Sequence, residues 1–364
     1  MKSITLFAAA GVAAAAAFVV FVPTYTGTPR SAQEVGFPQQ VLFHTAVERA
    51  AVNQAPPALP PAATGGPPAS QVYKNVQVLT DVSAAEFMRL QTAITDWVSP
   101  KEGCSFCHAG ADYASDAKPE KAAARVMLQM TRHLNADWSK HVAGAGVTCY
   151  TCHRGQPVPA EIWFPSTPPP HSPFLGRQDN WRESADTVRK FFPDDSYAEY
   201  LYDDQPIAVQ STTVEPSGTV SSRIEAKRIY EMMMTMSDGI GVNCGYCHNS
   251  RNFQSWAEST PYRWIGYDAL QLVRDLNRNY LRQIAALAPQ TRTLTTETRL
   301  PVLPARQSGP QLGNGLVLCA TCHVGITKPL NGVNMVHDYP GLTGSMTASP
   351  AAVDQSATPL PPPG

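Results

Sequence analysis

The chain has 364 residues and a formal net charge of −1, and charged residues make up 16% of it. That charged fraction lies below the roughly 25% typical of soluble domains. A near-neutral chain offers no electrostatic footprint for nucleic acid, so no nucleic-acid partner is expected. The length suffices for two or three ordinary domains, and the 33 prolines occur in clusters that predict extended connecting segments.

The first element in chain order is an apolar run from Ile4 to Val22, preceded by Lys2. The run is long enough to span a bilayer as a helix. A cleaved signal peptide would have a shorter apolar region and a small-residue cleavage site, for which Ser31-Ala32 is only a weak candidate. We therefore predict that residues 1–23 are an uncleaved signal anchor, with Lys2 in the cytoplasm and the rest of the chain in the periplasm.

Residues 24–70 are predicted to be a proline-rich linker. The stretch Ala55–Pro68 cannot hold a helix, because proline lacks the backbone N–H and clashes with the preceding turn. Such a segment is expected to be extended and semi-rigid.

Beyond the linker, the pattern Cys-x-x-Cys-His occurs four times. Motifs one to four are Cys104–His108, Cys149–His153, Cys244–His248 and Cys319–His323, and they use all eight cysteines of the chain. The pattern is the attachment motif for c-type haem, in which two thiols bind the porphyrin and the His becomes an axial iron ligand. A pair of zinc sites with four thiolates each is the alternative, but it leaves the repeated His unexplained.

We therefore expect four covalently bound c-type haems. The thioether bonds are predicted at Cys104, Cys107, Cys149, Cys152, Cys244, Cys247, Cys319 and Cys322. The proximal iron ligands are predicted to be His108, His153, His248 and His323. Haem attachment to thiols belongs in the periplasm, which agrees with the predicted anchor.

A helix is predicted before each motif. Ser83 and Glu86 fit a capping box that opens a helix extending to Trp97. Pro119 suits the first turn of a helix that extends to Asp137. The third and fourth helices are expected over Ser222–Met236 and Tyr267–Leu287.

Four units of helix, loop and motif form an internal repeat. The predicted fold is mainly α with little β structure: a multihaem cytochrome c of two pseudo-symmetric dihaem halves, plus the N-terminal transmembrane helix. The halves are expected over residues 71–165 and 221–342, joined by a connecting segment, 166–220. Residues 343–364 form an Ala- and Pro-rich tail.

Methionines gather in the helices before the first three motifs: Met88, Met127, Met130, Met232, Met233, Met234 and Met236. Methionine is a common filler of cores, but three Met-bearing helices that each lead to a motif favour Met/His ligation, which suits electron transfer. The fourth helix has Ala269 where an alignment of Leu272–Asn277 with Met130–Asn135 places the counterpart of Met127. The fourth haem therefore needs another ligand or stays open. The loop residue His141 is a candidate; it could instead be a surface or propionate-bonding His.

Four segments around the motifs resemble the tetrahaem cytochrome c subunit of purple-bacterial photosynthetic reaction centres: Ala93–Cys104, Gly146–Gly155, Asn243–Asn249 and Thr321–Leu330. The resemblance spans about residues 70–342. It implies three haems with Met/His ligation and a fourth with two His ligands. By motif, the second ligand would be Met127 for haem two, Met233 for haem three and His141 for haem four.

The first haem departs from the family pattern. The family's methionine position is occupied here by Gln91, and Met88 lies one turn earlier on the same helix. We expect Met88 to be the ligand of haem one; Gln91, or an open high-spin site, is the alternative.

The resemblance also implies a function and partners. Such a subunit is an electron-transfer protein rather than an enzyme, and it lies on the periplasmic face of the photosynthetic membrane. It accepts electrons from a soluble c-type cytochrome or a high-potential iron–sulfur protein and rereduces the photo-oxidised bacteriochlorophyll pair. Its neighbours are the reaction-centre L, M and H subunits and the light-harvesting ring. Motif three would lie nearest the pigments and motif one farthest from them. Family members usually carry a lipidated N-terminal Cys, and the helix Ile4–Val22 would replace it here.

Two other classes of protein remain as alternatives. A membrane-anchored, quinol-oxidising tetrahaem cytochrome of anaerobic respiration also has one N-terminal helix and four motifs. It relies mostly on two-His ligation, whereas Met232–Met236 is a dense methionine cluster here. A multihaem enzyme such as a nitrite reductase would need an open haem, which only the first site leaves arguable.

Overall fold

The structure is a computed structural model that describes residues 46–142, 144–163, 171–172, 176–177, 196–202, 206–207, 222–287 and 315–344. Within these ranges the fold is mainly α, as predicted, and the only strands are β1 (His171–Ser172) and β2 (Gly176–Arg177), which pair antiparallel. The predicted membrane anchor and the tail beyond residue 344 lie outside the described residues. In the part of the chain that is described, no helix is both long and apolar enough to cross a bilayer.

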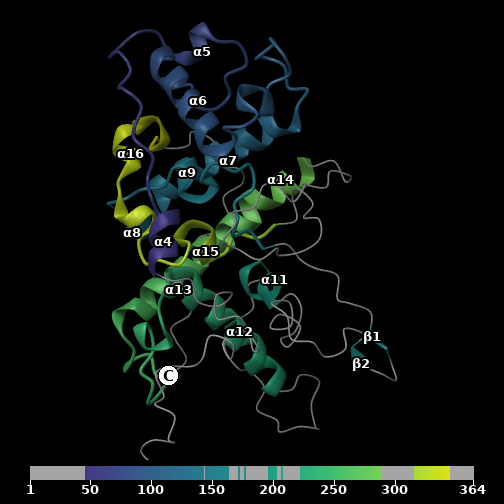
Figure 1. Ribbon diagram of the computed structural model, residues 1–364, viewed down its shortest axis with the longest axis vertical. Coiled ribbons are helices and arrows are strands. Elements are labelled where there is room, and N and C mark those ends of the chain that lie inside the picture. The colour runs from purple at the N-terminus through teal and green to yellow at the C-terminus, as the bar shows by residue number, and fades with distance from the viewer. Residues whose placement is uncertain are drawn as a thin grey trace, which may run out of the picture.

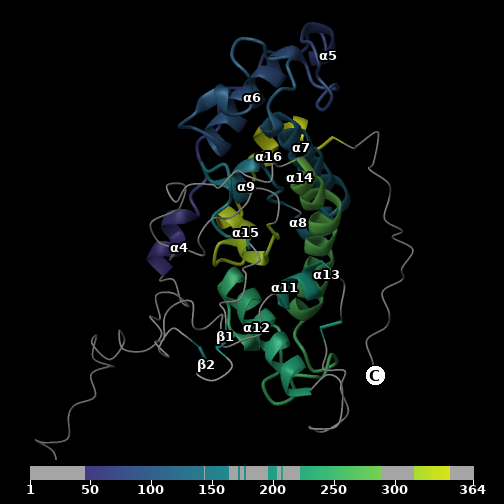
Figure 2. The ribbon, with the colours of Figure 1, turned by 90° about the vertical axis from the view of Figure 1, so that its right-hand side faces the viewer.

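The molecule is elongated, and the four motifs are distributed along its length (Figure 1). Helix α6 (Ala84–Val98), which leads into motif one, lies at one end. Helices α9 (Cys149–His153) and α15 (Cys319–His323), which are motifs two and four, lie near the middle. The green loops after α12 (Ser222–Ile240), which contain motif three, lie toward the other end in both views (Figure 2). The order along the long axis is therefore one, two, four, three.

The first two long helices begin where the sequence predicts. The Ser83 side chain accepts a hydrogen bond from the Glu86 N–H (3.2 Å) at the start of α6. The Glu86 carboxylate bonds Arg89 (3.1 Å), so only the serine half of the predicted capping box forms. Helix α7 spans Pro119–Asp137, as expected.

The other two long helices are longer than predicted. Helix α12 continues one turn past Met236 to Ile240. The last one begins at Pro261 and not at Tyr267: α13 (Pro261–Leu276) passes through a π-helical turn, η3 (Asn277–Leu281), into α14 (Arg282–Leu287). The Thr260-Pro261 start resembles the Lys118-Pro119 start of α7, because proline at the first helical position loses no hydrogen bond.

Helices α7 and α13 make equivalent contacts with the motifs that they connect. The N-cap residue of each one bonds the preceding motif: Lys118 Nζ donates to the Phe106 carbonyl (3.1 Å) and Thr260 Oγ1 to the Tyr246 carbonyl (2.6 Å). Near the end of α7, Asn135 pairs with the backbone of Val147, just before motif two. Asn277, which directly follows α13, pairs with Val317 before motif four in the same way.

Helices α7 and α13 each also bond a segment from a distant part of the chain. Arg132 Nε of α7 donates to the Gly344 carbonyl (2.9 Å), beyond motif four. Arg274 Nε of α13 donates to the Tyr200 carbonyl (2.7 Å) in α11 (Ser196–Leu201), beyond motif two. The two motif pairs therefore exchange their following segments, which ties the chain into one body.

Two buried apolar clusters fill the space between the helices. The larger one lies among α7, α11, α12 and α13, and includes Leu201, Met232 and Leu276. The smaller one packs α6 against the region after motif four through Leu90, Tyr339 and Leu342.

The described part of the segment expected to be a linker holds helical structure that the sequence did not predict, since α5 (Ala69–Val72) also begins at its end. Helix α4 (Ala46–Val52) lies within residues 24–70, and Asn53 at its end is fully buried. The proline-rich stretch Ala55–Pro68 contains no helix, as expected. This part of the chain therefore combines an extended segment with a segment that packs against the rest of the molecule.

Candidate haem sites

Motifs two and four fold as single helical turns. In α9 the Thr148 N–H donates to the Thr151 hydroxyl (3.0 Å), and in α15 the Leu318 N–H donates to the Thr321 hydroxyl (2.9 Å). A helical turn places residues i, i+3 and i+4 on one face. The two thiols and the imidazole of each motif therefore face the same side, as attachment to one porphyrin requires.

Motifs one and three have a different local structure. They begin with 3-10 turns, η1 (Gly103–Phe106) and η2 (Cys244–Tyr246), and carry an aromatic residue where the other two motifs have threonine. Their first cysteines are exposed, whereas all four cysteines of motifs two and four are half-buried.

Three of the four motif histidines are held by their Nδ1 atoms. His153 Nδ1 pairs with the Gln156 carbonyl (2.9 Å), His323 Nδ1 with the Ile326 carbonyl (2.9 Å) and His248 Nδ1 with the Phe253 carbonyl (3.0 Å). A carbonyl acceptor requires the proton on Nδ1, which leaves the Nε2 lone pair for a metal. The histidine of motif one, His108, packs edge-on against the Tyr113 ring, with the ring centroids 5.0 Å apart.

His141 and His323 come together in the centre of the molecule. Their ring centroids are 6.2 Å apart, although the residues are far apart in sequence. A metal bonds imidazole nitrogen at about 2 Å, so one iron between two imidazoles places their ring centroids about 6 Å apart. The buried Nδ1 of His141 has no hydrogen-bond partner among the described residues. The pair fits the two axial positions of one haem.

Burial keeps both imidazoles in the state that a ligand needs. It lowers the pKa of His323 to about 4 and also lowers the pKa of His141. Both rings are therefore neutral near pH 7, with lone pairs available for iron.

The predicted methionine ligands lie on the expected helices. Met127 is half-buried and packs against the larger apolar cluster, and Met233 on α12 is half-buried too. On α6, Gln91 is half-buried, whereas the Met88 side chain is 48% exposed. The structure thus distinguishes the environments of Met88 and Gln91 without joining either to motif one.

The cysteines do not form the zinc sites considered above. All eight lie in the described part of the chain as free thiols, and no group of three or more His, Cys, Asp or Glu side chains there is arranged to hold a metal ion.

Helices that each precede a Cys-x-x-Cys-His motif, with the motif thiols and imidazole on one face, define a c-type cytochrome. Residues 25–343 match the family described as the photosynthetic reaction centre cytochrome c subunit. The chain belongs to this family. It is thus an electron-transfer subunit of the photosynthetic reaction centre, carries covalently bound c-type haem, and is associated with the reaction-centre complex in the photosynthetic membrane.

Individual relatives agree with this assignment. The chain is 39% identical to the photosynthetic reaction center cytochrome c subunit of Rubrivivax gelatinosus over 333 residues, covering 91% of this chain and 87% of the relative. It is 39% identical to the subunit of Thermochromatium tepidum, covering 82% of this chain and 73% of that one. Cytochrome c-554 of Chloroflexus aurantiacus is 27% identical, with 76% and 74% covered. These comparisons give the respiratory alternative no support.

Two residues beside the central motifs, Arg154 and Asn53, were not predicted from the sequence. Arg154 directly follows motif two with a positive φ of 51°, and Val324 follows motif four with a φ of 46°. Neither is a residue type that predicts this conformation. The shared Thr at the third motif position was the one available signal that motifs two and four form a pair.

Proposed function

We propose that the chain carries four c-type haems, takes electrons from a soluble c-type cytochrome or high-potential iron–sulfur protein, and rereduces the bacteriochlorophyll pair held by the L and M subunits. One observation carries this proposal: the motifs lie along an elongated body in the order one, two, four, three. A bound haem supplies reversible one-electron chemistry, and the protein supplies spacing, axial ligands and exclusion of water. Residues 71–165 and 221–342 would be the two dihaem halves.

The proposed second ligands follow the helices. They are Met127 for haem two, Met233 for haem three, His141 for haem four and Met88 for haem one, with Gln91 as the alternative. The His141–His323 separation of 6.2 Å supports the fourth assignment. Met/His ligation gives higher potentials than two-His ligation, so the central fourth site would have a lower potential than its neighbours.

The end that carries motif three is the proposed docking face for the pigment-bearing subunits. Four apolar side chains near this motif are 46–50% exposed: Phe253, Tyr262, Trp264 and Ile265. Trp256 packs at a tilt against Trp264, with ring centroids 4.5 Å apart, and the Arg263 guanidinium lies 4.0 Å from the Trp256 ring centroid. Aromatic and Arg side chains are enriched at protein interfaces, so this aromatic end suits a large partner surface. The H subunit and the light-harvesting ring would be neighbours within the same complex.

The remaining chain ends are assigned by sequence. Residues 1–23 would anchor the protein, with the body on the periplasmic face of the membrane, and residues 24–45 would be linker. The tail, 343–364, would pack over neighbouring subunits. An unchanged complex after deletion of that tail would rule out the last assignment.

Light-induced haem oxidation tests the function. Membranes that contain the full complex receive a short flash while the haem absorbance is followed. We expect rapid oxidation of the haem at motif three, followed by electron transfer from the others. A Cys104→Ser, Cys107→Ser variant, which lacks only the haem of motif one, serves as the control that keeps the fast phase. Absence of any flash-induced haem oxidation would contradict the proposal.

The first site has its own test. In a Met88→Leu variant we expect haem one to become high-spin and to bind carbon monoxide, while haems two to four keep their spectra. A Gln91→Leu variant is the matched comparison on the same helix. An unchanged low-spin signal in Met88→Leu would exclude Met88, and loss of the signal in Gln91→Leu alone would assign the role to Gln91.

A further inference from the structure

Asn53, at the end of α4, is the most connected buried amide near the central motifs. Its side chain is fully buried, and Nδ2 donates to the carbonyls of Arg49 (2.7 Å) and Val324 (3.1 Å). Its Oδ1 accepts from Arg154 Nη1 (3.0 Å) and from the Leu330 N–H (3.4 Å). One amide therefore joins the N-terminal segment to the loops that follow motif two and motif four.

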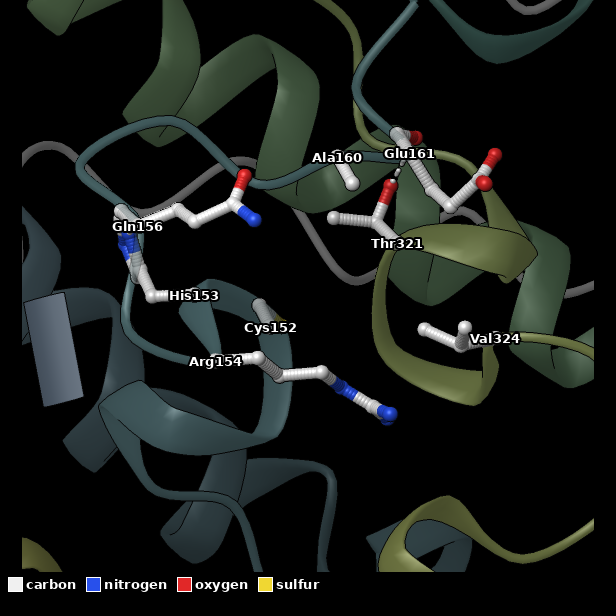
Figure 3. Close-up of a pocket in the computed structure, with 8 residues that line it drawn as sticks. All are labelled: Cys152, His153, Arg154, Gln156, Ala160, Glu161, Thr321 and Val324. Carbon is white, nitrogen blue, oxygen red and sulfur yellow. Dashed lines mark hydrogen bonds between the residues drawn. The ribbon is translucent and has the colours of Figure 1, made fainter. Parts of the chain in front are cut away.

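The Arg154 guanidinium lies between these two loops. It follows the iron ligand His153 and extends toward Val324, across the pocket between motifs two and four (Figure 3). Besides Asn53, it donates to the carbonyls of Thr151 (3.2 Å), Cys322 (2.9 Å) and Val52. All four acceptors are neutral oxygens, so these bonds position the cation. Glu161, which lines the same pocket, is the carboxylate that acts on Arg154 through space, and it offsets part of the charge.

Helix α4, which ends at Asn53, also contacts the helix that leads to motif three. Arg49 on α4 forms an ion pair with Asp238 near the end of α12 (3.6 Å). The α12 backbone meets the loop of motif four directly, where the Gly325 N–H donates to the Gly239 carbonyl (2.8 Å). Residues Ala46–Asn53, here called the clip, therefore contact the loops that follow motifs two and four and the helix that leads to motif three.

We propose that the clip is a positioning element of the electron-transfer path: Asn53 holds the Arg154 cation between motifs two and four, and this cation raises the reduction potentials of the two central haems. Reduction lowers the charge of a haem by one unit, so a fixed cation nearby favours the reduced state. The effect is strong in a buried site, where the effective dielectric constant is low. Burial lowers the pKa of Arg154, yet an arginine remains charged in proteins.

The inference rests on the proposed haems at motifs two and four, but it does not rest on light-driven electron transfer. A redox titration of the haem absorbance in membranes measures each potential in the dark. Loss of flash-induced oxidation with the expected potential shifts would overturn the proposed function and leave the clip in place. Normal flash-induced haem oxidation without the expected shifts in reduction potential would overturn only the proposed role of the clip.

The first variant is Arg154→Gln, which removes the charge and keeps a hydrogen-bonding side chain. We expect the potentials of haems two and four to fall, with a smaller change at haem one. Arg154→Lys keeps the charge and should recover most of the shift. Unchanged central potentials in Arg154→Gln would overturn the proposal.

The second variant, Asn53→Ala, tests whether Asn53 acts through Arg154. We expect a shift in the same direction as in Arg154→Gln, but smaller, and no further shift when the two substitutions are combined. Additive shifts would mean that Asn53 does not act through the cation. The control is Gln54→Ala, because Gln54 is exposed and bonds only the Ala50 carbonyl (2.8 Å).

A purely structural role for Asn53 predicts a different result. Asn53→Ala would then lower the thermal unfolding midpoint and leave all potentials unchanged in the protein that assembles. If Asn53→Ala yields no four-haem protein, Asn53→Ser is titrated with the same criteria, since it retains a small polar group at the site.

Discussion

The central motifs, two and four, are built differently from the outer motifs, one and three. The central ones are helical turns whose threonines bond their own backbone, and they meet each other through Arg154 and the clip. The outer ones are 3-10 turns with exposed first cysteines. Each outer motif is bonded by the N-cap residue of the helix that follows it.

This difference suggests a division of roles. Contacts among distant segments hold the central pair, so the spacing between those two sites is set by the tertiary structure. The outer pair depends on nearby residues and lies toward the two ends of the molecule, where electrons would enter and leave. Substitutions at the central pair should therefore alter several sites at once, whereas those at the outer pair should act locally.

The largest expected effect comes from His141. The substitution His141→Ala removes the proposed second ligand of haem four. That haem should therefore become high-spin and bind carbon monoxide after reduction. Carbon monoxide difference spectra of wild type and variant measure the change. The control is His337→Ala, because the His337 side chain is 83% exposed. A low-spin fourth haem in His141→Ala would exclude His141 as its ligand.

A second test of the central packing compares two glycines. A Cβ at Gly241 would lie 1.9 Å from the Gly325 carbonyl oxygen, and the φ of +69° already disfavours a side chain. Gly241→Ala should therefore destabilise the protein by about 3 kcal/mol or more. In Gly266→Ala, a Cβ meets nothing within 4 Å on helix α13, so a gain of about 0.5–1 kcal/mol is expected. Chemical denaturation measures both, and equal values would contradict the close approach of α12 and motif four.

The sequence predicted the local structure of the chain more completely than its long-range contacts. Ser83 and Pro119 marked helix starts because capping and proline preferences act over a single turn. The same rule applied to Thr260-Pro261 would have placed the start of α13 correctly. Four cysteine pairs, each followed by His, predict the haem sites because that chemistry needs a fixed spacing.

The clip could not be read from the sequence. Asn53 follows a short helix inside a proline-rich stretch, and nothing local indicates that its amide meets residues 101 and 277 positions away. Arg154 and Val324 end α9 and α15 as left-handed C-caps, a conformation that neither residue type favours and that their identity therefore did not predict. The aligned segments that end at Asn135 and Asn277 share one long-range feature that the alignment did not predict: both amides pair with the backbone before a central motif.

That equivalence of the two asparagines gives the third prediction. Asn277→Ala leaves the Val317 N–H and two carbonyls without partners in a site only 1% exposed, so a loss of about 1–3 kcal/mol is expected. Asn135→Ala should cost less, because its site is half-buried and water can replace the amide. Denaturation of both variants, with the exposed Gln77→Ala as control, measures the difference. A larger loss for Asn135→Ala would contradict this ranking.

The smallest expected effect on stability comes from the contact between helices α7 and α13. His133 on α7 pairs with Asp275 on α13 through Nε2 (2.6 Å) and with Asp137 through Nδ1 (2.6 Å). The bond to Asp275, followed by the other contacts with these carboxylates, raises the pKa of His133 although burial opposes the shift. The two carboxylates thus favour the protonated form of His133 between the helices.

The sign of the pH dependence follows from that direction. A folded-state pKa above the unfolded value of about 6.5 means that the pair contributes its full stability below that pH. The contribution is lost as the pH rises through the raised folded-state pKa. We expect His133→Gln to lower stability by about 0.5–1 kcal/mol near pH 6 and by much less above pH 8. Unfolding midpoints of wild type and variant over this range test it, with His337→Gln as control. A pH-independent difference would mean that His133 stabilises the helix contact as a neutral side chain.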